Sequence, residues 1–224
     1  MYGYLVGDLI FLAIWLILFI LRKDLRHEML VMSILIGVIS VFTGYYWWTM
    51  DWWHPMTITG TRVGIEDFLM GFSGGGILAS IYEEVFRKRL YKRTLTKNFP
   101  PGSMVLLLLA WLTGMLFWGL HLTSFWAATI AMIAIAAIMF YYRRDLLIAG
   151  FITGICMAII SFPMYWGILL IYPNWVQQTY YLNHLSGILI TGIPIEEIIF
   201  WFLAGLLWGP FYEYWKGEKL RRRD

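Results

Sequence analysis

Seven apolar stretches, each about the length of a helix that crosses a membrane, constrain the fold of this chain more than any other feature. They cover residues 4–21, 29–47, 65–86, 104–120, 125–142, 146–171 and 186–208. A helix needs roughly 20 apolar residues to cross the hydrocarbon core of a bilayer. Only 14% of the residues are charged, against about a quarter in a soluble domain. We therefore expect an all-α integral membrane protein with seven transmembrane helices, and exclude a soluble globular domain.

The basic residues predict the orientation of the chain. Every Lys and Arg except Arg62 lies in residues 22–26, 87–97, 143–144 or 216–223. With seven spans these four segments share one side, which the positive-inside rule makes cytoplasmic. We therefore expect a cell-membrane protein with its N-terminus outside and its C-terminus in the cytoplasm. The net charge of only +3, carried in short clusters, argues against nucleic-acid binding.

The sequence contains an internal repeat. LRKDL at residues 21–25 resembles YRRDL at 142–146, and GIEDF at 64–68 resembles PIEEI at 194–198. We expect a first repeat of three helices in residues 1–97, a connecting fourth helix in 98–122 and a second three-helix repeat in 123–224. Because one helix connects the copies, they are expected to be parallel, related by an axis along the membrane normal.

Two adjacent acids occur in each copy, at the predicted outer beginnings of the third and seventh helices: Glu66 with Asp67, and Glu196 with Glu197. A carboxylate at a helix N-terminus accepts free backbone N–H groups and suits the helix dipole. Neighbouring helical positions point about 100° apart, so one acid of each pair can cap the helix while the other faces the bundle. Since acids in membrane segments are costly and usually functional, we predict a functional role for at least one of Glu66 and Glu196.

These acids lie in segments that resemble the lycopene cyclase domain family. The resemblance rests on WWHPMTITG at residues 52–60 followed by GIEDF at 64–68, and on ITGIPIEEIIFW at 190–201. The second copy fits that family's Pro-x-Glu-Glu motif, whereas the first lacks the proline and the second glutamate. The resemblance covers nearly the whole chain and implies the tandem form of the small, membrane-embedded carotenoid β-cyclases.

The resemblance also implies a reaction. An acid protonates the terminal double bond of a linear carotenoid, the next alkene attacks the cation, and proton loss yields a β-ring without net oxidation. Glu196 or Glu66 would be the acid, and Glu197 or Asp67 the paired base. No cofactor is expected, since the sequence has no Gly-x-Gly-x-x-Gly turn after a strand for a flavin or nicotinamide.

Aromatic residues of the predicted outer loops and of the last stretch are candidates for substrate binding. Their faces would stabilise a carbocation by about 0.5–2 kcal/mol each and exclude water. The predicted set is Trp47, Trp52, Trp53, Tyr181 and Trp201. For each of the loop residues, the ordinary aromatic belt at a membrane interface is the alternative.

Several alternatives remain open from the sequence. Arg62, which is also a candidate for the substrate site, either pairs with Glu66 or Asp67, or is an interfacial arginine. A non-catalytic carotenoid- or lipid-binding bundle is the alternative function. His54, His121 and His184 with the glutamates would instead suit a metal-dependent intramembrane hydrolase, although their spacing favours no metal site. The expected partners are a hydrophobic polyene and the lipid bilayer, with carotenoid-pathway enzymes or a second copy of the chain left open.

Overall fold

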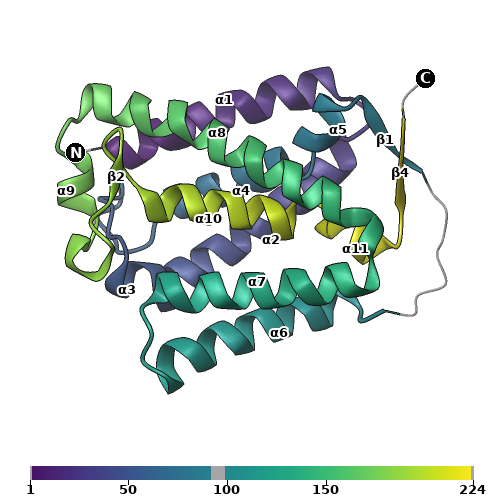
Figure 1. Ribbon diagram of the computed structural model, residues 1–224. Coiled ribbons are helices and arrows are strands. Elements are labelled where there is room, and N and C mark those ends of the chain that lie inside the picture. The colour runs from purple at the N-terminus through teal and green to yellow at the C-terminus, as the bar shows by residue number, and fades with distance from the viewer. Residues whose placement is uncertain (1, 92–98, 223–224) are drawn as a thin grey trace.

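The computed structural model describes residues 2–91 and 99–222 and shows a bundle of helices that run alongside one another (Figure 1). The two chain termini lie at opposite ends of this bundle, which we call the N-terminal end and the C-terminal end. The longer helices are α1 (Gly3–Leu21), α2 (Arg26–Thr43), α4 (Ile65–Leu78), α6 (Gly102–Gly114), α7 (Ser124–Tyr142), α8 (Leu147–Ile171) and α10 (Ile195–Trp208).

Shorter elements join or extend these helices. The helical ones are η1 (Gly44–Trp48), α3 (Thr49–Asp51), α5 (Ile81–Val85), η2 (Met115–Gly119), η3 (Arg144–Leu146), α9 (Trp175–Thr179), η4 (Leu182–His184) and α11 (Phe211–Lys216). The strands are β1 (Lys88–Tyr91), β2 (Leu189–Ile190), β3 (Ile193–Pro194) and β4 (Lys219–Arg222). The segments η1 and η2 are π-helical and continue α2 and α6 without a break.

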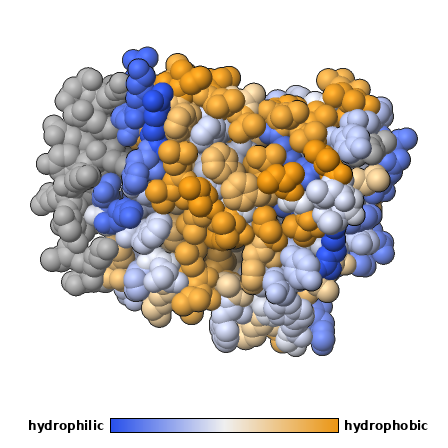
Figure 2. Space-filling view, turned by 180° about the vertical axis from the view of Figure 1, so that it is seen from behind, coloured by the Kyte–Doolittle hydropathy of each residue, from blue (hydrophilic) through white to orange (hydrophobic). Residues whose placement is uncertain are grey.

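Within residues 2–91 and 99–222, six helical segments are long and apolar enough to cross a membrane. They are Gly3–Leu21, Arg26–Asp51, Gly102–Gly119, Ser124–Tyr142, Arg144–Ile171 and Ile195–Lys216. Hydrophobic side chains cover the middle of the surface in Figure 2, and hydrophilic residues lie toward both ends of the bundle. Length, composition and surface together identify a membrane protein, as the sequence predicts.

The bounds predicted for the third and seventh apolar stretches are wrong. The third stretch is not one helix, because α4 ends at Leu78 and α5 begins only at Ile81. The last helix begins at Ile195 rather than near 186. The residues before it form a β2–β3 hairpin whose turn, Thr191 and Gly192, has positive φ angles of 54° and 88°. A backbone in that left-handed region cannot continue a right-handed helix.

The internal repeat is visible in the packing and in local details. α2 packs on α4 in the first copy as α8 packs on α10 in the second. At the C-terminal end, β1 pairs antiparallel with β4, with Leu90 opposite Leu220. These leucines are equivalent in the repeat, and such a pairing is what a two-fold relation between the copies produces.

The arginines at the ends of the first helices match as well. Arg22 Nε lies 3.0 Å from Asp24 Oδ1, and Arg143 Nε lies 2.9 Å from Asp145 Oδ1. In both pairs the second nitrogen, Nη2, bonds the other carboxylate oxygen. The repeated Arg-x-Asp sequence therefore forms the same two-pronged ion pair in each copy.

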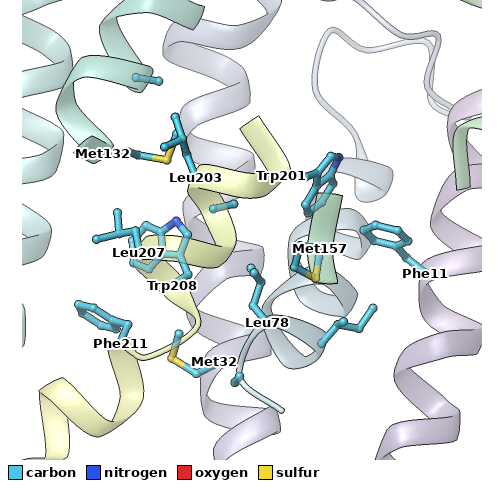
Figure 3. Close-up of a cluster of buried hydrophobic side chains, with 14 of the residues drawn as sticks. Phe11, Met32, Leu78, Met132, Met157, Trp201, Leu203, Leu207, Trp208 and Phe211 are labelled. Carbon is cyan, nitrogen blue, oxygen red and sulfur yellow. The ribbon is translucent and has the colours of Figure 1, made fainter. Parts of the chain in front are cut away.

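The contact between the two copies is not symmetric. α1 packs against α8, but in the described chain the equivalent pair, α7 and α2, has no comparable contact. The hydrophobic core surrounds α10, whose Trp201, Leu203, Leu207 and Trp208 lie at the centre of the cluster in Figure 3. The two copies therefore contact each other less extensively beside α2 and α7 than beside α1 and α8. The candidate site lies on the side of α2 and α7.

Candidate active site

One face of α10 lines a cavity of about 430 Å³. Glu197, Phe200, Trp201, Ala204 and Trp208 share this face because each lies three or four residues from at least one other member of the set. Glu196, one position earlier, points away from it. The volume lies within the range of small-molecule binding sites, about 300–1,000 Å³.

The equivalent face of α4 lines the same cavity. Met70, Gly71, Gly74 and Leu78 occupy the repeat positions of Phe200, Trp201, Ala204 and Trp208. The two faces meet at Gly74 and Trp201. A Cβ atom added at Gly74 would lie 3.5 Å from the Trp201 ring, in ordinary van der Waals contact.

Aromatic residues near the N-terminal end complete the wall. Of the residues predicted for substrate binding, Trp47, Trp52, Trp53 and Trp201 line the cavity, whereas Tyr181 and Arg62 lie outside it. The indoles are held in edge-to-face contacts. The Trp52 ring is 5.2 Å from that of Phe200 and 5.2 Å from that of Phe125.

A backbone bridge fixes the two loops that carry these rings. His54 N–H donates to the Thr179 carbonyl oxygen at 2.7 Å, and Tyr181 N–H donates to the Trp52 carbonyl oxygen at 3.0 Å. The predicted residue Tyr181 therefore positions Trp52 through its backbone, while its neighbour Tyr180 is buried beside the cavity.

Among the described residues, Glu197 is the only one with a carboxyl side chain that lines the cavity. It is only 6% exposed, unlike most glutamates, and it accepts a hydrogen bond from the Tyr165 hydroxyl. The Trp52 indole N–H and the Tyr180 hydroxyl also lie near this carboxyl group, but neither has the geometry of a hydrogen bond. Burial and the nearby Glu197 raise the pKa of Tyr180 well above its ordinary value, so its hydroxyl stays neutral.

The first acid of each pair is bound to the loop that precedes its helix. Glu66 Oε1 accepts a hydrogen bond from Ile58 N–H, and Glu196 Oε1 accepts one from Ser186 N–H at 2.7 Å. In both residues the second oxygen, Oε2, is buried and has no hydrogen-bond partner among the residues that the structure describes. Glu66 and Glu196 therefore have equivalent surroundings, and neither lines the cavity.

The second acid of the first copy, Asp67, caps its own helix. Asp67 Oδ2 accepts a hydrogen bond from Gly64 N–H at 2.8 Å, and Oδ1 accepts one from the Tyr4 hydroxyl at 3.2 Å. Tyr4 lines the cavity and Asp67 does not. Tyr4 therefore separates the first-copy carboxyl group from the cavity.

Arg62 lies at the surface, outside the cavity. Its Nη2 donates to the Tyr45 carbonyl oxygen at 2.7 Å, and its guanidinium carbon lies 4.5 Å from the centre of the Tyr45 ring. Of the two alternatives for Arg62, the interfacial position agrees with these contacts.

The histidines do not form a metal site with the acids in the described part of the chain. His184 Nδ1 lies 2.9 Å from the Asp51 carbonyl oxygen, and the His54 ring lies 4.3 Å from that of Tyr181. Within residues 2–91 and 99–222, no three His, Cys, Asp or Glu residues are grouped so that they could hold a metal ion. The hydrolase hypothesis therefore has no set of ligands in these residues.

The sequence analysis missed the three phenols around the acids: Tyr4, Tyr165 and Tyr180. Tyr165 had a usable signal, because a hydroxyl in an apolar span usually faces other helices. The alignment that pairs residues 21–25 with 142–146 also pairs Gly44 of the first copy with Tyr165 of the second copy. A Cβ atom at Gly44 would lie 3.3 Å from Asp67 Oδ1, so this position adjoins the second acid in both copies.

A carboxyl group in an apolar, aromatic cavity, within a membrane-spanning bundle, defines a membrane protein with an acid-bearing site for a hydrophobic molecule. Comparison with known families is more specific. The sequence model of the family described as lycopene cyclase matches residues 2–85 and 123–215, and the chain belongs to this family. The two matched segments correspond to the two copies and omit α6, as the tandem arrangement predicts. No curated protein and no solved structure matches the chain significantly.

Proposed function

We propose that this protein is a carotenoid β-cyclase that closes the ends of lycopene by proton-initiated isomerisation, without a cofactor. The observation that carries the proposal is the position of Glu197, the carboxyl group in the aromatic cavity. Membership of the lycopene cyclase family supports a carotenoid cyclase. An acid in an apolar site is the group that such a reaction requires.

We assign Glu197 as both the acid and the base. Protonated Glu197 transfers its proton to the terminal double bond, which leaves a carboxylate and a tertiary carbocation. The next alkene attacks this cation, so that a carbon–carbon bond closes the ring and the positive charge moves to a ring carbon. Proton loss to the Glu197 carboxylate then forms the ring double bond. Substrate and product are isomers, and the carboxyl group ends in its starting state.

The cavity wall supplies the remaining requirements. The faces of Trp52 and Trp201 stabilise the cation by about 0.5–2 kcal/mol each, and the apolar wall excludes water that would quench it. The Tyr165 hydroxyl, which donates to Glu197, holds the carboxyl group in place and stabilises the transient carboxylate.

The assignment of Glu197 modifies the roles predicted from sequence. Glu196 and Glu66 were the predicted acids, but both bind loop N–H groups and lie outside the cavity. We propose that they hold the loops before α4 and α10 in place. Asp67, the other predicted base, is proposed to be a helix cap that Tyr4 separates from the substrate.

The experiment is expression in a host that accumulates lycopene, followed by pigment chromatography. Ring-containing carotenoids are expected where the protein is present and absent from the empty host. Unchanged lycopene beside folded protein would contradict the proposed reaction. The alternative function, a non-catalytic carotenoid-binding bundle, predicts instead that unchanged lycopene copurifies with the protein. The apolar cavity suits that outcome too, so bound pigment must be identified.

We further propose seven crossings, with the N-terminus outside and the C-terminus in the cytoplasm. In this topology α4 and α5 together form the third crossing, and the repeats occupy residues 1–97 and 123–224 around a connecting helix in 98–122. The opposite positions of the termini in Figure 1 support an odd number of crossings.

Cysteine labelling tests this orientation in intact cells. In a Cys156→Ser background, a membrane-impermeant maleimide is expected to label Asn183→Cys directly and Lys216→Cys only after lysis. The reverse pattern would invert the topology.

A further inference from the structure

The wall of the cavity reaches the molecular surface between α2 and α6. Val38 and Phe42 on α2 line the cavity, yet they are 58% and 51% exposed. Leu107 on α6 lines it and is 71% exposed, and Ala110 is exposed as well. Side chains that belong both to a cavity wall and to the surface mark an opening.

These four side chains form the two edges of one gap. Val38 and Phe42 are four residues apart on α2, and Leu107 and Ala110 are three apart on α6, so each pair shares a helix face. In the described chain α2 and α6 have no extensive contact with each other. Both helices belong to the segments long and apolar enough to span a membrane, which places the gap at the depth of the hydrocarbon.

Aromatic contacts close the gap at the N-terminal end of the bundle. There α2 continues as η1 and α6 as η2, and the Trp47 and Trp118 rings lie 5.8 Å apart. Tyr46 also meets Trp118, edge to face at 6.5 Å. Single π-helical turns occur frequently at functional sites. Here the two π-helical turns join the helices just beyond the gap, so the opening faces lipid rather than that end of the bundle.

We propose that the gap between α2 and α6 is the entrance through which the polyene reaches the cavity from the bilayer. We further propose that the part of the polyene that does not react lies in this gap during the reaction. The inference rests on the proposed function, because it assigns the gap to the same substrate. A polyene longer than the cavity needs room beyond the wall when one end lies beside Glu197. Through this apolar path the polyene also reaches the cavity without crossing the polar ends of the bundle.

Retention of pigment tests this entrance separately from catalysis. The protein carries Glu197→Gln, so that bound lycopene is not converted, and is purified in detergent from a host that accumulates lycopene. Absorbance then gives the amount of pigment per protein. Ala110→Phe fills the gap from α6, and Val38→Trp fills it from α2. Each is expected to lower the retained pigment about tenfold or more.

Ile133→Phe is the matched control, because Ile133 is 51% exposed on α7 and does not line the cavity. It should retain as much pigment as the parent. Thermal unfolding of all variants must match the parent, which excludes misfolding as the cause of lost pigment.

The outcomes separate the two proposals. Parental pigment in both Ala110→Phe and Val38→Trp would overturn the entrance, even if the active protein forms rings. Bound lycopene that depends on the gap, together with no ring formation by the protein with Glu197 intact, would overturn the cyclase and leave the entrance supported. A parent without pigment would contradict both.

Discussion

The two acid sites of the molecule are equivalent in sequence and different in surroundings. In each copy the first acid, Glu66 or Glu196, accepts a loop N–H group and leaves one oxygen without a partner. The second acid accepts a tyrosine hydroxyl, from Tyr4 in one copy and from Tyr165 in the other. Only the second copy's acid lines the cavity.

Two features distinguish the second acids of the two copies. One is the length of the side chain, which differs by one methylene group, and the other is the helix that supplies the tyrosine hydroxyl. Asp67 is shorter than Glu197 and is held by Gly64 N–H at the start of its helix. Tyr4 comes from α1, whereas Tyr165 comes from α8. The duplicated fold therefore retained two acid positions, and we propose that only one of them is catalytic.

The helix faces beyond the acids diverged in the same direction. α10 presents Trp201 where α4 presents Gly71, and Trp208 where α4 presents Leu78. The first copy thereby supplies space and the second copy supplies aromatic surface. A cavity with one reactive side is the result, although the fold has two related halves.

Removing the second-copy carboxyl group should have the largest effect. Glu197→Gln preserves the size of the side chain but has no acidic proton, and general acid catalysis contributes about 10²–10⁴-fold to a rate. We expect ring formation to fall by about 10³-fold in the purified enzyme, as measured by chromatography of the product. A loss below about tenfold would assign the proton to another group.

Making the aromatic wall of α10 aliphatic should have the next largest effect. Trp201→Leu keeps the position apolar and removes one ring from the cation. The loss of about 0.5–2 kcal/mol corresponds to a rate about 2–30-fold lower. Met70→Leu, on the equivalent face of α4, is the control and should leave the rate unchanged. Equal losses of rate in the two variants would mean that the faces of α4 and α10 do not differ in their contribution to the reaction.

The two tyrosines should differ in a smaller but measurable way. Tyr165→Phe removes the hydroxyl that holds Glu197 and should lower the rate several-fold, roughly 1 kcal/mol of transition-state stabilisation. Tyr4→Phe should leave the rate near that of the parent, because its partner Asp67 does not touch substrate. The opposite order of rates would place the chemistry in the first copy.

The smallest expected effect is on stability and concerns the first-copy cap. Asp67→Ala removes the acceptor for Gly64 N–H and for the Tyr4 hydroxyl. Loss of such a cap costs about 1–2 kcal/mol of unfolding free energy, which thermal unfolding in detergent would show. An unchanged unfolding temperature would mean that Asp67 has no structural role.

Sequence reasoning predicted most of the fold, because apolar length is a local property. It placed both acid pairs in first helical turns, where the structure has them. It also proposed Trp201 for substrate binding, and this residue lines the cavity four residues after Glu197, on the same helix face. The break after Leu78 and the loop before Ile195 were missed, since both segments are as apolar as the helices beside them.

The choice among the four acids could not be made from sequence. The 100° between Glu196 and Glu197 shows that one of them faces the bundle, but packing decides which. That packing depends on the absence of an extensive contact between α2 and α7 in the described chain, which no local pattern encodes. The phenols of Tyr4 and Tyr165 come from other helices, so their positions also depend on the tertiary fold.

The most direct test of the proposed division between the copies compares Glu197→Gln with Asp67→Asn. Both changes replace a carboxylic acid by the amide of the same size, at equivalent positions of the repeat. Both variants are expressed at matched protein levels in a lycopene-accumulating host, and the ring-containing pigment is measured. We predict near-parental rings with Asp67→Asn and at least about 100-fold fewer with Glu197→Gln. Equal losses, or rings lost only with Asp67→Asn in folded protein, would contradict the account.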